Sequence, residues 1–134
     1  RGLATYTTFY ARRGLMTARR DELTRMVRAI CKTLVWVAGA SAAEIAGVVA
    51  SYFPDVPAAT LTAAIGRYQS LGIWNRRPVM QRAGYDRLRD SLVSGKFVNP
   101  GAPFEVAVDN SIAEAVSAAV VARAYDNIGL LPRS

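Results

Sequence analysis

Hydrophobic residues recur at intervals of three and four along most of this chain, and that spacing is typical of amphipathic helices. The longest regular stretch predicts a helix from about Arg19 to Ala38 that stops at Gly39. The positions expected to face inward on it are Leu23, Met26, Val27, Ile30, Leu34, Val35 and either Val37 or Ala38.

Four shorter helices are expected to follow. Ser41 and Glu44 form a capping-box pattern that predicts the start of the second helix, and Pro54 ends it. The inward positions predicted on this helix are Ile45, Val48, Val49 and either Tyr52 or Phe53. The remaining helices are predicted at about Ala58–Leu71, with Gly72 as the stop, at about Met80–Ser94, and at about Asn110–Tyr125.

The opening stretch "LATYTTFYARR" is rich in Thr, Tyr and Phe and predicts a strand at Thr5–Tyr10. Residues 96–109 read as an extended, turn-rich connector. The expected fold class is therefore mainly α, with about five helices and one N-terminal strand. A single strand cannot satisfy its own edges, so its partner would lie outside this sequence or in a second copy of the chain.

Positive charge dominates the composition of the 134 residues, with 17 Lys+Arg against 10 Asp+Glu and a net charge of +7. The arginines concentrate before residue 30 and again between residues 76 and 89. We interpret them as a solvated basic face, and a phosphate-binding patch is the functional alternative.

Several kinds of chemistry are excluded by residue content. With no histidine and one cysteine, Cys31, the chain can form neither a His-based triad nor a thiolate cluster. The carboxylate pairs Asp86–Asp90 and Asp21–Glu22 sit among arginines at helical spacing, which indicates surface ion pairs. We therefore expect no enzyme, no catalytic or metal-binding residues and no cofactor. The apolar stretch at residues 33–43 is too short to cross a bilayer.

Two alternatives use particular segments of the chain. Residues 41–77 have the order of a winged helix-turn-helix DNA-binding regulator, with "GIWNRRP" as the wing. Only Arg67 and Gln69 on its second helix could make a strong base or phosphate contact, which argues against nucleic acid as a partner. The other alternative is a helical module that binds a protein through residues 110–134.

The order of motifs along the whole chain resembles a known family. After the Thr/Tyr-rich opening come "RRDELTRMVRAICKTLVWV", "YFPD" before "AIGRYQSLGIW", "PVMQRAGYDRLRDSLVSGKF" and "VDNS". This order is similar to the C-terminal part of the substrate-binding proteins of ABC transporters for nitrate, sulfonate and taurine, a family that includes thiamine-pyrimidine-precursor binders. The resemblance extends from Thr5 to about Val116.

The resemblance implies a C-terminal fragment of a two-lobed α/β type II periplasmic-binding-protein fold. Residues 1–14 would be the strand that returns to the first lobe, residues 15–98 a helical region, and residues 99–134 a connector and final helix. Function would be capture of a small ligand by hinge closure, with delivery to a transporter permease from a periplasmic or lipid-anchored location. The missing N-terminal part would hold most ligand contacts, and a fragment without it would tend to self-associate.

Within this chain, the expected ligand-binding residues are Tyr6, Thr7 and Thr8, beside the crossover between lobes; the alternative is that they only pair with a neighbouring strand. We predict that Trp36 and Trp74 belong to the core, and an aromatic shelf for a ligand is the functional alternative.

Overall fold

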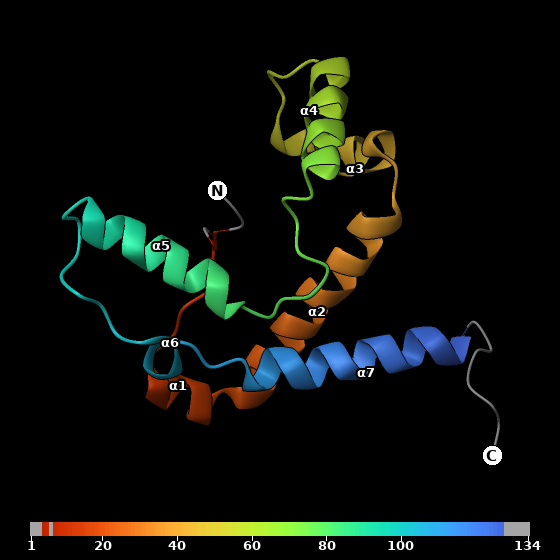
Figure 1. Ribbon diagram of the computed structural model, residues 1–134. Helices are drawn as coiled ribbons and strands as arrows, with labels where there is room; N and C mark the ends of the chain where they lie inside the picture. Colours follow the sequence, from red (N-terminus) through yellow and green to blue (C-terminus); the bar gives the residue numbers. More distant parts are fainter. Residues whose placement is uncertain (1–3, 6, 128–134) are drawn as a thin grey trace.

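The computed structural model describes residues 4, 5 and 7–127 of the chain. This part contains the α-helices α1 (Arg13–Ala18), α2 (Arg20–Gly39), α3 (Ala42–Val49), α4 (Ala58–Leu71), α5 (Arg82–Ser94), α6 (Phe104–Ala107) and α7 (Ser111–Asn127), and the 3-10 turn η1 (Ala50–Tyr52). α2 runs from a lower body, which comprises α1, α5, α6 and the start of α7, up to a head made of α3, η1 and α4 (Figure 1).

The lower core lies where α2 crosses α7. Cys31 of α2 is buried against Ile112 and Val116 of α7, and further apolar side chains cover their edges. These covering residues are Met16, Leu23, Val27 and Val120. Cys31 is therefore a small core residue, as its position in the apolar pattern predicts.

The head has a separate core between α3 and α4, formed by Ile45, Ala46, Leu61 and Ile65. The predicted capping box is confirmed, since Ser41 Oγ accepts from the Glu44 backbone N–H at 3.2 Å and the Glu44 carboxylate accepts from the Ser41 N–H at 2.7 Å. This hydrogen bonding lowers the pKa of Glu44 below its usual value.

The end of α2 is joined to the head by apolar packing of Val37 and Ala40 on the head core and by a hydrogen-bonded side chain of α4. Gln69 Nε2 of α4 donates to the Ala40 carbonyl at 2.9 Å and lies 3.5 Å from the Val37 carbonyl. α4 then ends at Gly72, whose φ of +63° falls in the left-handed region that favours glycine at a helix C-terminus.

The helical part of the prediction is confirmed, and the boundaries of four of the five expected helices agree within about two residues. The second helix was expected to reach Pro54, but α3 ends at Val49 and only the 3-10 turn η1 continues to Tyr52. Two short helices were not predicted: α1, before the expected long helix, and α6, inside the expected connector. The inward assignment was wrong for several residues, which have exposed side chains: Met26, Val35, Val48, Tyr52 and Phe53.

The predicted strand at Thr5–Tyr10 was wrong for the residues that the structure describes there. Residues 7–12 have no regular secondary structure, and Phe9 and Tyr10 are 73% and 97% exposed. The preference of Thr, Tyr and Phe for strands acts only when a neighbouring strand supplies hydrogen bonds, and residues 4, 5 and 7–127 contain no strand.

Truncating the core contact between α2 and α7 should destabilise the whole molecule. We expect Ile112→Ala to lower the free energy of unfolding by about 2–5 kcal/mol, because it leaves a cavity beside Cys31. The matched control is Ile73→Ala, at a position that is 49% exposed, which should cost much less. Urea denaturation followed by circular dichroism measures both values, and equal losses would contradict this account of the core.

Candidate functional site

The opening segment reaches the lower body at one close contact with α5. The Thr5 N–H donates to the Gly84 carbonyl at 3.1 Å. Gly84 is buried, and a Cβ at this position would lie 2.6 Å from Thr5 Oγ1. A glycine inside a helix that lacks a turn signal often marks such an approach, and this was the signal in the sequence that could have identified the contact.

The start of α5 is held against the start of α7 by a two-way amide contact. Asn110 Oδ1 accepts from the Met80 N–H at 3.0 Å, and Asn110 Nδ2 donates to the Met80 carbonyl at 2.9 Å. Next to it, Asp109 Oδ1 accepts from the Ser111 N–H at 2.9 Å and caps α7. The hydrogen bonds from Ser111 lower the pKa of Asp109 below its usual range.

The side of α5 that faces α6 is also fixed. Tyr85 Oη donates to the Ala102 carbonyl at 2.7 Å, and its ring meets the Phe104 ring edge to face at 5.6 Å. Arg82 pairs with Glu105 and places its guanidinium 4.8 Å from the centre of the Phe104 ring. These contacts hold one side of α5 and leave another side open to solvent.

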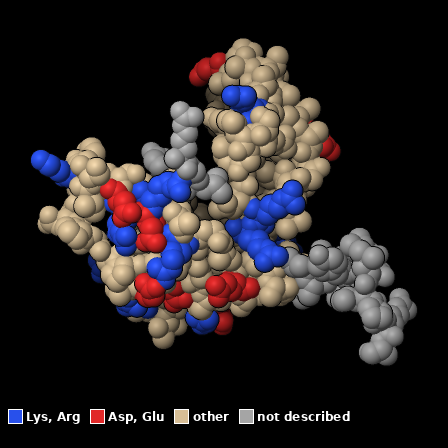
Figure 2. Space-filling view, viewed as in Figure 1, with Lys and Arg blue, Asp and Glu red and all other residues tan. Residues whose placement is uncertain are grey.

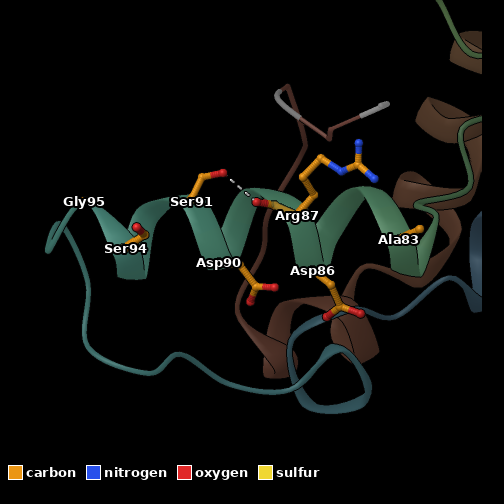
Figure 3. Close-up of a pocket in the computed structure, with 7 residues that line it drawn as sticks. All are labelled: Ala83, Asp86, Arg87, Asp90, Ser91, Ser94 and Gly95. Atoms are coloured by element: carbon orange, nitrogen blue, oxygen red, sulfur yellow. Dashed lines mark hydrogen bonds between the residues drawn. The ribbon is translucent and has the colours of Figure 1, made fainter. Parts of the chain in front are cut away.

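The open side of α5 carries a shallow hollow of about 820 Å³. Its lining consists of Ala83, Asp86, Arg87, Asp90, Ser91, Ser94 and Gly95, which all belong to α5 or its C-cap (Figure 3). In this view the Arg87 side chain projects from one side of the helix, and the Asp86 and Asp90 side chains project from the other side. A surface formed by one helix has no side walls from other elements, so these residues alone cannot enclose a small molecule.

The charges of this hollow are only partly neutralised. Arg89 bridges the two acids, with its Nη1 3.2 Å from Asp86 Oδ1 and its Nη2 3.0 Å from Asp90 Oδ1. Ser91 Oγ donates to the Arg87 carbonyl at 2.8 Å and does not reach its guanidinium. Among the described residues no ion pair involves Arg87, which is therefore available to an anionic group approaching from outside. Arg87 was not among the residues predicted from the sequence to bind a ligand.

The predicted ligand-binding residues are not assembled into a site. Tyr6 lies outside the described residues, and Thr7 and Thr8 are exposed just after the contact at Gly84. The prediction that Trp36 and Trp74 are core residues was wrong, because their side chains are 41% and 37% exposed.

Some of the arginines that precede residue 30 make contacts within the chain. Arg13 Nη2 donates to the Val106 carbonyl at 2.6 Å, and Arg19 pairs with Glu22. These contacts fit a solvated face better than a phosphate patch. After α4, residues 72–81 contain no strand, so the wing expected for a winged helix-turn-helix is not formed there.

Neither a metal-binding group nor a membrane-spanning helix is found among the described residues. No group of three or more His, Cys, Asp or Glu side chains in these residues is arranged to hold a metal ion. Among the helices of residues 4, 5 and 7–127, none has both the length and the apolar character needed to span a bilayer.

The chain is similar to one binding protein of known sequence. It is 24% identical over 116 residues to the Bacillus subtilis (strain 168) protein named "Putative binding protein YtlA". The match covers 87% of this chain and 35% of that protein, so the chain spans about a third of the length of this relative. No protein-family model and no solved structure matches the chain. The likeness suggests a binding-protein class and leaves the ligand open.

Substituting Gly84 should detach the opening segment from α5. We expect Gly84→Ala to break the Thr5 contact, since its Cβ would overlap Thr5, and to speed tryptic cleavage at Arg12 and Arg13 several-fold. Gly47→Ala is the matched control, because a Cβ there meets open space within α3 and should be neutral or slightly stabilising. Unchanged proteolysis in Gly84→Ala would contradict the contact.

Acid should weaken the start of α7 through Asp109. Because the folded pKa of Asp109 is lowered, its capping stabilises the protein above the ordinary Asp pKa of about 3.9 and is lost as pH falls through the folded value. Asp109→Asn should therefore be less stable than the wild type at pH 7, and the difference should shrink at lower pH. Thermal unfolding from about pH 7 to about pH 2.5 measures it, and a constant difference would argue against the cap.

Proposed function

We propose that this chain is the C-terminal portion of the solute-binding component of an ABC transporter, with a type II periplasmic-binding-protein fold in the whole protein. In this proposal the protein captures a small nitrogen- or sulfur-containing ligand, such as nitrate, a sulfonate or taurine, between two lobes that close about a hinge. It works outside the cytoplasm, in the periplasm or on a lipid anchor, and hands the ligand to a permease.

The observation that carries the proposal is the match to YtlA, which covers most of this chain but only 35% of the relative. A piece of a larger binding protein is expected to lack a closed core of its own. Only eight hydrophobic side chains of the described residues are buried, and Phe9 and Tyr10 of the opening segment stand in solvent. Both features fit a helical part that covers a body formed by other residues.

The same proposal assigns a role to the open side of α5. In this proposal Tyr6, Thr7 and Thr8, which follow the contact of Thr5 with α5, would lie at the edge of the cleft. Arg87 has no ion pair among the described residues, and a sulfonate, carboxylate or nitrate group is the kind of anion that a guanidinium binds with two hydrogen bonds. The rest of the protein would supply the missing walls.

Ligand-induced stabilisation tests this function. The test uses the full product of the gene that encodes this chain, with nitrate, alkanesulfonates, taurine or pyrimidines. One of these ligands should raise its free energy of unfolding by about 2.7 kcal/mol at a concentration one hundred times the dissociation constant, and should therefore raise its melting temperature. The 134-residue chain alone, which lacks the walls of the site, should show no shift with the same ligand. A gene product without any further α/β region, or one that no member of the panel stabilises, would refute the proposal.

A further inference from the structure

The exposed face of α2 carries three basic side chains in one line, and we name this surface the basic stripe. Arg25, Arg28 and Lys32 are all exposed and follow one another at spacings of three and four residues. At 3.6 residues per turn they lie within about 60° of one another around the helix axis. Leu23 and Val27, which cover the lower core, belong to the other side of the helix.

The charge of the basic stripe is not neutralised within the described residues. Residues 23–43 contain no Asp or Glu, and two members of the stripe are four residues apart, a spacing at which like charges repel on a helix. The charge of Arg25 acts on Glu22, but the Glu22 carboxylate pairs with Arg19. Among the described residues no ion pair involves any member of the stripe, whereas two arginines of α5 pair with acidic side chains.

An exposed tryptophan continues the line of the basic stripe. Trp36 lies one turn beyond Lys32, within about 80° of all three basic side chains, and is 41% exposed. Figure 2 shows that the head carries few charged side chains and that Lys, Arg, Asp and Glu gather below it. From Arg25 to Trp36 the face is about 16 Å long, and it changes from cationic to aromatic toward the head.

This combination of side chains fits the surface of an anionic membrane. Lys and Arg attract lipid phosphates, and each one near such a surface strengthens binding by about fivefold. Trp prefers the boundary between headgroups and acyl chains, because its ring is apolar and its N–H needs a polar partner. A duplex nucleic acid also attracts the cations, but its phosphate backbone presents no apolar layer to the indole ring.

The charge of the stripe also argues against its being covered by another part of a longer protein. Lysine is depleted at the centre of protein interfaces, and burying a cation costs free energy unless an acidic partner is brought to it. A protein segment packed over the stripe would have to supply acidic groups for all three cations. A lipid surface supplies phosphates over its whole area.

We propose that the basic stripe and Trp36 form a docking surface for an anionic lipid membrane. α2 lies along the membrane surface and does not cross it. Its three cations contact the lipid phosphates, and the Trp36 ring enters the layer beneath the headgroups. The proposal does not rest on the solute-binding function, because it uses only the exposed face of one helix.

Binding to lipid vesicles tests the proposal. The 134-residue chain should bind vesicles that contain phosphatidylglycerol at least about tenfold more tightly than vesicles of phosphatidylcholine alone, and added salt should weaken this binding. In Trp74→Phe, which leaves Trp36 as the only tryptophan, the emission should shift to shorter wavelength on the anionic vesicles. Equal binding to both kinds of vesicle, or an unchanged Trp36 emission, would overturn the proposal.

Substitutions locate the surface. Arg25→Gln, Arg28→Gln and Lys32→Gln together should weaken binding to the anionic vesicles by about a hundredfold. Helix content should not change, because glutamine is a good helix former and the three side chains are exposed.

The matched control removes three exposed arginines that lie elsewhere: Arg12→Gln, Arg67→Gln and Arg77→Gln. It lowers the net charge of +7 by the same three units and should keep most of the binding. Equal weakening by the two triple variants would show that only the net charge matters, and the assignment to α2 would then be wrong.

Two other partners give different results. If the chain binds duplex DNA more tightly than anionic vesicles at the same salt concentration, the stripe is a nucleic-acid surface and the proposal is refuted. If the chain binds the vesicles but the full product of its gene does not, another part of the protein covers the stripe, which refutes the proposal as well. The expected result is vesicle binding of similar affinity by both.

Discussion

The packing of α2 against α7 is the contact on which the rest of the molecule depends. Cys31 on the middle of α2 meets Ile112 and Val116 on the first turns of α7, so helices that are distant in the sequence cross at one buried point. α2 has 20 residues and extends well beyond this crossing, which places its far end in the head. The crossing of α2 and α7 therefore sets the positions of both the lower body and the head.

The position of α5 follows from that crossing. Asn110 stands directly before α7 and holds Met80, two residues before α5, through two hydrogen bonds. α5 in turn receives the opening segment at Gly84 and presents Arg87 on its open side. The placement of Arg87 is a property of the arrangement, because the two segments that hold α5 come from distant parts of the sequence.

The molecule separates charge from exposed apolar surface. The lower body carries most of the arginines, some of which stabilise it through internal contacts such as that of Arg13 with the Val106 carbonyl. The head carries few charges and leaves aromatic side chains exposed. The lower body therefore meets solvent mainly through charged side chains, whereas the head meets it mainly through uncharged ones.

The sequence by itself determined the five main helices, because their starts and stops depend on local chemistry: the capping box at Ser41, the left-handed turn at Gly72 and the apolar spacing between them. It also determined the absence of histidine and of a second cysteine. It could not determine burial. Trp36 and Trp74 lie in apolar patterns yet remain half exposed, and the Thr/Tyr-rich opening forms no strand in its described residues, because both outcomes depend on which distant surfaces are available to pack or pair with. Only the tertiary structure decided that Gly84 receives Thr5 and that Asn110 holds α5, because a glycine within a helical pattern can mark a close approach but not the distant residue that makes it.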